Sequence, residues 1–302
     1  MDSNDVVVIG LGSMGLGIAE ALRAKGLAVT GVDVDAGRRA SFEGLGGRTA
    51  VDVAAAVAGV RVVIVVVVDA AQLEAVLFDA GVAGAMDPDG VVVASPTIAP
   101  DTAKAIGARV EAAGPAYLDA PISGGPIKAQ AGELTVMASG SDLAFARAEP
   151  VLQAMATTVH RLGEAAGAGS AMKLVNQLLA GVHIAAACEA MALAIRLGLE
   201  PQRVYEVINS AAGASWMWTN RVPHILEGDY RPASAVEIFT KDLGLVTDTG
   251  RTSNLPTPLS AQALQLFLMT AAMGMGRDDD TSVVRLYAQL AGLTLPGCGD
   301  EQ

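Results

Sequence analysis

Three residues at helical spacing are the first candidates for chemistry. The stretch GSAMKLVNQLLAGV, residues 169–182, consists of small and aliphatic residues apart from the polar trio Lys173, Asn176 and Gln177. Spacings of three and four residues bring the three side chains onto one face of a helix. An ammonium on a buried face is costly unless it is paired or used. The alternative is a surface lysine whose carbon chain lies along the helix.

The neighbouring residues predict that this face is buried on both sides. Met172, Val175, Leu179 and Val182 form an apolar stripe at helical spacing, and residues 174–188 carry no charge. In such surroundings the neutral form of a lysine is favoured, so that it can accept a proton near neutral pH. We therefore predict that Lys173 is a proton acceptor and that Asn176 and Gln177 bind substrate.

A glycine-rich turn follows the first apolar run. The pattern G-x-G-x-x-G begins directly after a strand predicted at 6–9 and opens a predicted helix. Glycines allow a tight turn and close approach of a pyrophosphate, and the helix N-terminus offers N–H groups to the phosphates. We predict that the dinucleotide site comprises Gly10, Leu11, Gly12, Ser13, Met14 and Gly15. The alternative is a glycine-rich turn that binds nothing.

The end of the second predicted strand bears on the choice of dinucleotide. Asp33 stands roughly 20 residues after the last glycine of the pattern, as the fingerprint requires. A carboxylate there accepts hydrogen bonds from a ribose 2′-hydroxyl and repels a 2′-phosphate. We predict NAD as the cofactor, whereas the nearby Arg38 and Arg39 leave NADP as an alternative.

A second glycine pair follows a later strand. In DAPISGGP, residues 119–126, a predicted strand runs out into Ser123, Gly124 and Gly125. Ligands of doubly wound sheets bind outside the carboxyl ends of the strands, and glycines there let backbone N–H groups approach an anion. These three residues are candidates for binding a carboxylate, and an ordinary tight turn is the alternative.

The order of elements predicts two domains. Short β-branched runs alternate with helical patterns up to about residue 163, which indicates βαβ units and a doubly wound parallel sheet, a Rossmann-type α/β fold. After residue 167 helical periodicity dominates. We therefore predict a NAD-binding domain at 1–166 and an all-α substrate and dimerisation domain at 167–302. The second begins with a long helix at 170–197, followed by helices at 201–212, 234–253, 257–274 and 279–291.

Composition excludes several classes of function. The 302 residues carry a net charge of −12 and no basic cluster, so binding to nucleic acid or to an anionic membrane is not expected. The longest aliphatic run, Val62–Val68, is far shorter than a bilayer span and is expected to be a strand buried on both faces. Cys188 and Cys298 suggest no disulfide framework, and the N-terminus has no basic, apolar leader, so a cytoplasmic location is expected.

Other polar and aromatic residues have simpler interpretations. No metal site is predicted, because the histidines at 160, 183 and 224 lack partners at metal-ligand spacing. Asp278, Asp279 and Asp280 are expected to form the solvated start of a helix. Trp216 and Trp218 are expected to flank a loop and to anchor it in the core. The alternative is that they form a wall of the substrate pocket.

In these motifs the chain resembles the β-hydroxyacid dehydrogenase family, which includes 3-hydroxyisobutyrate and tartronate semialdehyde enzymes. The matching pieces span the chain: GLGSMGLG at 10–17, DAPISGGPIKAQAGELTVMASG at 119–140, MKLVNQ at 172–177 and KDLGLV at 241–246. Longer stretches at 176–194, 210–230 and 294–297 are most similar to the branch that acts on L-threonate.

The resemblance implies a role for each matching residue. Lys173 corresponds to the lysine that takes the hydroxyl proton while hydride passes to the nicotinamide. Residues 123–125 correspond to the carboxylate site, and Asn176 corresponds to the catalytic amide that orients the substrate and the lysine. Thr97 and Lys241 correspond to positions near the cofactor. Pro96 departs from the Ser-Ser-Thr that the family often has before that threonine.

The resemblance implies NAD-dependent oxidation of a small hydroxy acid, L-threonate to its 2-keto acid. 3-Hydroxyisobutyrate, D-glycerate and tartronate semialdehyde stay open as substrates. A non-catalytic dinucleotide-binding scaffold is the rival from another class, and the retained lysine and amide argue against it. The alanine-rich run 183–194 suits close helix contact, so a homodimer or homotetramer is expected.

Overall fold

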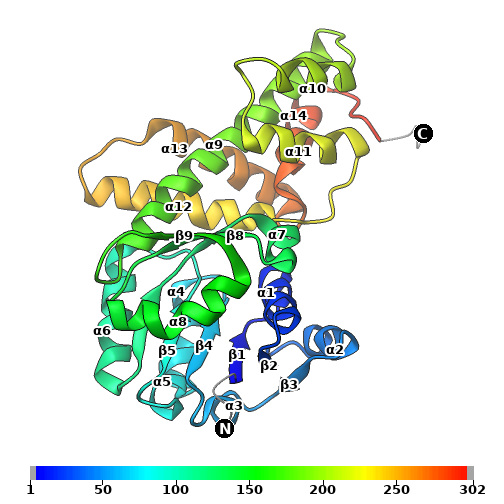
Figure 1. The fold of residues 1–302 in the computed structure, drawn as a ribbon. Coiled ribbons are helices and arrows are strands. Elements are labelled where there is room, and N and C mark those ends of the chain that lie inside the picture. Colours follow the sequence, from blue (N-terminus) through cyan, green and yellow to red (C-terminus); the bar gives the residue numbers. More distant parts are fainter. Residues whose placement is uncertain (1–4, 298–302) are drawn as a thin grey trace. The chain divides into compact units, whose positions relative to one another are not determined.

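The computed structural model of the protein describes residues 5–297, and the structural statements below concern that range (Figure 1). The chain divides into two compact units between Lys173 and Leu174, whereas the sequence suggested a division between residues 166 and 167. The difference arises because the first turn of the long helix α9 (Ala168–Arg196) is hydrogen-bonded to the first unit. Cys298 lies outside the described residues.

A six-stranded parallel sheet with the order β3-β2-β1-β4-β5-β6 organises the first unit. The order reverses between β1 and β4, as in dinucleotide-binding doubly wound folds, and this confirms the predicted fold class. The third strand was not predicted, because its three residues are too few to form a pattern. The strands are β1 (Asp5–Ile9), β2 (Ala28–Val32), β3 (Arg48–Ala50), β4 (Val62–Val65), β5 (Val91–Ala94) and β6 (Ala116–Asp119).

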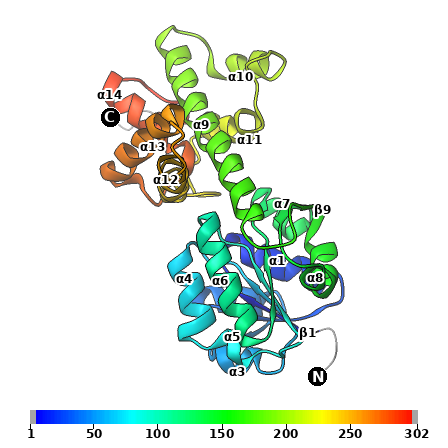
Figure 2. The ribbon, with the colours of Figure 1, turned by 90° about the vertical axis from the view of Figure 1, so that its left-hand side faces the viewer.

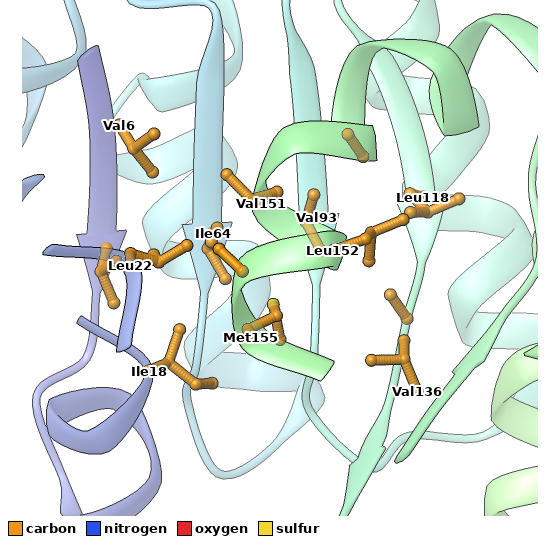
Figure 3. Close-up of a cluster of buried hydrophobic side chains, with 14 of the residues drawn as sticks. Val6, Ile18, Leu22, Ile64, Val93, Leu118, Val136, Val151, Leu152 and Met155 are labelled. Atoms are coloured by element: carbon orange, nitrogen blue, oxygen red, sulfur yellow. The ribbon is translucent and has the colours of Figure 1, made fainter. Parts of the chain in front are cut away.

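The central strands are buried on both faces. Along β1, Val6 and Val8 belong to one apolar cluster, and Val7 and Ile9 to a second cluster on the other face. Figure 3 shows the first cluster, in which Val6 and its neighbours from β4 and β5 meet side chains of α1 and α8. Burial on both faces explains why the strands are nearly continuous aliphatic runs.

Helices cover both faces of this sheet. Figure 2 shows α3 to α6 on one face and α1, α7 and α8 on the other. Since the helices follow the strands in alternation, the loops at the carboxyl ends of the strands gather along one edge. The helices are α1 (Ser13–Ala24), α2 (Ala36–Gly44), α3 (Val53–Val57), α4 (Ala70–Glu74) with the π-turn η1 (Ala75–Asp79), α5 (Val82–Ala85), α6 (Pro100–Ala113), α7 (Gly125–Ala131) and α8 (Asp142–Met155).

A second, three-stranded sheet follows β6. Its order is β7 (Ile122–Ser123), β8 (Leu134–Ala138) and β9 (Ala156–Arg161), with the first pair antiparallel and the second parallel. The sequence predicted the last two strands at 133–140 and 157–163. The two-residue β7 matters because it leads directly into the glycine pair at 124–125.

The second unit is helical and packs around α9. Ile184, Cys188 and Met191 of α9 are buried in its core, where Phe239 and Phe267 stack with ring centroids 5.2 Å apart. The remaining elements are α10 (Pro201–Asn209), α11 (Trp216–Glu227), α12 (Val236–Thr252), α13 (Pro258–Thr270), the π-turn η2 (Ala271–Met275), the 3₁₀ turn η3 (Asp280–Ser282) and α14 (Val283–Ala291).

The loop expected around the two tryptophans is instead the start of α11. Ser215 caps this helix, since its hydroxyl accepts a hydrogen bond from the N–H of Trp218 at 3.0 Å. Pro223 inside the helix obscured the helical pattern in the sequence. Trp218 is buried in the core, as expected of an anchor, whereas Trp216 is half exposed.

One described helix is long and apolar enough to span a bilayer by length and composition alone. This helix is α9, whose most apolar window has a mean hydropathy of 1.9, and half of that window is buried inside the protein. Core helices of folded proteins have the same composition, and the contacts of Ile184 and Met191 are of that kind.

The acidic triplet at 278–280 is not a solvated helix start, so that expectation was wrong. Asp279 and Asp280 are fully buried. Both oxygens of Asp280 accept hydrogen bonds from Nε of Arg221, at 2.9 and 3.1 Å, and Asp279 lies 3.2 Å from Nδ1 of His224. Arg221 and His224, which compensate the buried charges, come from α11, far away in the sequence. No pattern in the sequence around 278–280 therefore indicates that these carboxylates are buried.

We predict that the free energy of unfolding falls as the pH rises from 6 to 8.5. The hydrogen bond to Asp279 raises the pKa of His224, so its contribution is complete below the unfolded value of about 6.5 and disappears above the folded value. Burial raises the pKa of Asp280 to about 7, which gives a change of the same sign at lower pH. Thermal unfolding at several pH values measures the slope.

Two substitutions separate this pair from other titrating groups. His224→Gln removes the imidazolium charge and should flatten the slope above about pH 7, where the contribution of Asp280 has already been lost. The exposed His160 supplies the control, since His160→Gln should leave the slope unchanged. An unaltered slope in the His224 variant contradicts the assignment.

Candidate active site

The glycine-rich turn lies where the strand order reverses. Gly10 follows β1 with a φ of +93°, and a Cβ there would lie 2.2 Å from the carbonyl oxygen of Val66. A Cβ at Gly15 would lie 1.8 Å from the oxygen of Gly10, so the first turn of α1 packs directly against the strand end. Only glycine fits at either position.

The middle of the turn is open. No atom lies within 4 Å of a Cβ built on Gly12, which is the N-cap of α1 and makes no side-chain capping bond. The first-turn N–H groups of α1 therefore face space that a ligand can enter. This arrangement fits the pyrophosphate of a dinucleotide.

Asp33 joins the glycine-rich turn to the end of β2. Its side chain is buried, and Oδ2 accepts a hydrogen bond from the N–H of Leu11 at 2.7 Å. Oδ1 accepts from the N–H of Asp35 at 2.9 Å. Arg38 reaches the same carboxylate at 3.5 Å, and Arg39 donates to the backbone oxygen of Asp33 at 2.6 Å. The carboxylate is thus held in place, with both arginines beside it.

The predicted anion loop adopts a glycine-dependent conformation. Gly124 and Gly125 have φ values of +139° and +79°, which side-chain-bearing residues rarely adopt. They follow Ser123 at the end of β7 and begin α7, whose N-cap makes no side-chain hydrogen bond. Nothing lies within 4 Å of a Cβ built on Gly125. The turn is accessible to a small anion.

The structure brings the predicted lysine to this turn. Lys173 is 8% exposed, and its Nζ donates a hydrogen bond to the backbone oxygen of Ile122 at 2.8 Å. Ile122 immediately precedes Ser123, so Nζ of Lys173 lies next to the Ser123–Gly125 turn. Two motifs separated by 51 residues in the chain thus meet within the first unit.

The two amides make a network in the second unit. Nδ2 of Asn176 donates to Oε1 of Gln177 at 2.9 Å, and Gln177 in turn donates to the buried carboxylate of Asp242. The ammonium of Lys241 donates to the other oxygen of Asp242. Sequence reasoning missed Asp242, although an acidic residue amid the apolar positions of KDLGLV was a usable signal. Thr97 lies half-buried just after β5, away from this network in the chain.

The apolar stripe of α9 has the opposite exposure from the expected one. Met172, Val175 and Leu179 are 43%, 56% and 50% exposed, whereas Lys173 and Gln177 are buried. The polar side chains find hydrogen-bond partners inside their units, and the apolar residues between them consequently face outward. The prediction that both neighbouring faces are buried was therefore wrong for this chain by itself.

Known proteins resemble the chain along almost its whole length. Residues 5–163 match the family model described as the NAD-binding domain of 6-phosphogluconate dehydrogenase. Residues 167–287 match the model described as NAD-binding of NADP-dependent 3-hydroxyisobutyrate dehydrogenase. Both results agree with the family resemblance noted from the sequence.

Individual relatives support the same grouping. L-Threonate dehydrogenase of Cupriavidus necator is 50% identical over 98% of this chain and 99% of the relative. The Escherichia coli enzyme of that name is 46% identical, over 97% and 96%. The crystal structure of 3-hydroxyisobutyrate dehydrogenase from Salmonella typhimurium has a TM-score of 0.88 at 47% identity, covering 93% and 99%.

Proposed function

Because the chain belongs to the β-hydroxyacid dehydrogenase family and is an NAD-dependent dehydrogenase, we propose that it oxidises L-threonate to the 2-keto acid, with Lys173 as general base. The observation that carries the assignment of the base is the position of its Nζ, 2.8 Å from the oxygen of Ile122 and next to the Ser123–Gly125 turn. A base and an anion site are the two groups that oxidation of a hydroxy acid requires besides a hydride acceptor.

In the proposed mechanism the turn at Ser123–Gly125 binds the substrate carboxylate through its backbone N–H groups and the serine hydroxyl. The hydroxyl on the adjacent carbon then faces Lys173, which takes its proton as the C–H bond breaks. Asn176 and Gln177, on the same helix, orient the remaining hydroxyls. NAD, when bound, would accept the hydride, so that the alcohol loses a hydride to the cofactor and a proton to Lys173, which is two electrons and two protons in total.

The glycine-rich turn is proposed to hold the cofactor. Residues Gly10 to Gly15 bind the pyrophosphate through the open N-terminus of α1, and Asp33 accepts hydrogen bonds from the ribose of the adenosine half. Thr97 and Lys241 are proposed to contact the cofactor in the same complex. The open space over Gly12 supports this arrangement.

L-Threonate is proposed over other hydroxy acids on the basis of the curated relatives that carry that name. The second candidate substrate is 3-hydroxyisobutyrate, which is favoured by the name of the Salmonella structure at 47% identity. In that substrate the hydroxyl is one carbon farther from the carboxylate. The turn and the base would have to tolerate that longer separation.

A substrate panel distinguishes these candidates. Purified protein with NAD is mixed separately with L-threonate, D-threonate, D-glycerate, tartrate and 3-hydroxyisobutyrate, and NADH absorbance is followed. We expect L-threonate to give the highest kcat/KM. A higher value for 3-hydroxyisobutyrate or D-glycerate would replace the proposed substrate within the same family. The absence of turnover with both NAD and NADP would favour a non-catalytic scaffold.

The exposed stripe of α9 supports a homo-oligomer. Met172, Val175 and Leu179 recur at the spacing of a helix-packing face, and exposed apolar rows of this kind are typical of interfaces. We propose that a second copy of the chain covers it. We also propose a cytoplasmic location, since Cys188 is a free thiol that suits a reducing compartment.

A further inference from the structure

The carboxylate of Asp119 holds the beginning of the helix that carries Lys173. Asp119 ends β6 and is almost completely buried. Its Oδ2 accepts hydrogen bonds from the N–H groups of Gly167 and Ser170, each at 2.9 Å. Its Oδ1 accepts from the hydroxyl of Ser170 at 2.7 Å. One buried side chain thus replaces a local N-cap of α9.

Ser139 completes the attachment. Its buried hydroxyl accepts a hydrogen bond from the N–H of Gly169 at 2.9 Å and donates to Oδ2 of Asp119 at 3.2 Å. A Cβ on Gly169 would lie 2.4 Å from the oxygen of Met137, so the backbone of α9 is in direct contact with β8. The N–H groups of Gly167, Gly169 and Ser170, at the beginning of α9, therefore all donate to buried side chains of the first unit.

The segment directly after β6 also binds the reactive side chain. Lys173 lies one helical turn after Ser170, and Ile122, which accepts its hydrogen bond, lies three residues after Asp119. Two attachments one turn apart fix both the rotation of the helix about its axis and its depth against the sheet. Removing the first attachment takes away the fixed helix turn on which Nζ depends for its position.

We propose that Asp119 is a positioning residue for the reaction, because through Ser170 and the first turn of α9 it sets the distance of Lys173 from the Ser123–Gly125 turn. The inference rests on the proposed function, in which Lys173 takes the proton. A carboxylate can accept all four hydrogen bonds, three from Gly167 and Ser170 at the positive end of the helix and one from Ser139. An asparagine lacks the charge and carries a donor on one side, so it cannot accept all four.

The first test compares two buried carboxylates. Asp119→Asn is expected to lower kcat by about 10- to 100-fold with little change in KM for NAD, since a displacement of about 1 Å can cost 100-fold. Asp279→Asn is the matched control, because Asp279 also accepts from two backbone N–H groups and one threonine hydroxyl but lies in the other unit. This control should lose stability and keep its kcat.

The second test uses a smaller change at Ser170. Ser170→Ala removes one of the four donors to Asp119 and should lower kcat, whereas Ser170→Thr keeps the hydroxyl and should keep kcat near the wild-type value. In parallel, amide hydrogen exchange of a peptide covering 167–173 should accelerate in Asp119→Asn and in Ser170→Ala. This readout does not depend on turnover.

The outcomes separate the inference from the function on which it rests. Lys173→Ala without activity, together with Asp119→Asn at wild-type kcat, would overturn the positioning role alone. If Asp119→Asn lowers kcat no more than Asp279→Asn does, the positioning role is likewise overturned. Undiminished turnover in Lys173→Ala would overturn the base assignment itself.

Discussion

Replacing Lys173 by alanine is expected to lower kcat by a factor of about 10² to 10⁴, the usual contribution of a positioned general base. Nζ of Lys173 is buried next to the Ser123–Gly125 turn, and solvent water has no fixed position from which to replace it. NAD binding should persist, because the proposed pyrophosphate site consists of backbone N–H groups at the N-terminus of α1. Steady-state NADH formation gives kcat, and calorimetry gives the affinity for NAD.

The control for this variant is a lysine of equal chemistry outside the site. Lys25 lies exposed at the end of α1, and Lys25→Ala should keep wild-type kcat and KM. A Lys173→Ala protein that turns over at the wild-type rate would show that another group takes the proton.

Substitution by alanine should lower the stability at one glycine of the turn and the affinity for NAD at another. At Gly15 the added methyl would lie 1.8 Å from the oxygen of Gly10, and no side-chain rotation relieves an overlap with backbone. The first turn of α1 would have to move away from β1. We expect Gly15→Ala to cost about 4 kcal/mol or more of unfolding free energy, measured by urea denaturation.

At Gly12 the methyl meets no protein atom, so the folded chain should keep its stability. It does occupy the space over the N-terminus of α1 that a pyrophosphate would enter. The Kd for NAD is therefore expected to rise by about tenfold or more, which corresponds to ~1.4 kcal/mol. Thermal unfolding and titration with NAD measure the two effects. Gly12→Ala with unchanged NAD affinity would place the pyrophosphate elsewhere.

The sequence predicted those features that local patterns encode. Alternating strands and helices identified the doubly wound sheet, and the glycine spacing identified the turn after β1, because both follow from backbone constraints within a few residues. The family resemblance added the reaction class. The buried strand predicted at 62–68 is present at 62–65, whereas Val68 lies beyond the strand and is 45% exposed.

Features that depend on partners distant in the chain were missed or inverted. The acceptor of the Lys173 hydrogen bond lies 51 residues away, and nothing in the helix itself points to Ile122. The composition of α9 could not reveal that its polar face is buried and its apolar stripe exposed, because periodicity identifies two faces without saying which one packs. Asp280 was misread for the same reason, since Arg221 comes from another helix.

The thiol of Cys188 has a consequence for studying the helical unit. It is completely buried among α9, α12 and α14, where its sulfur donates to the oxygen of Thr281 at 3.5 Å, and burial raises its pKa. A thiol reagent reacts with the thiolate, so it can modify this group only after the surrounding helices separate. In a Cys298→Ser variant, Cys188 is the one cysteine left in the chain. The rate at which a thiol reagent labels it therefore measures how often that core opens, and no foreign label has to be built into the protein.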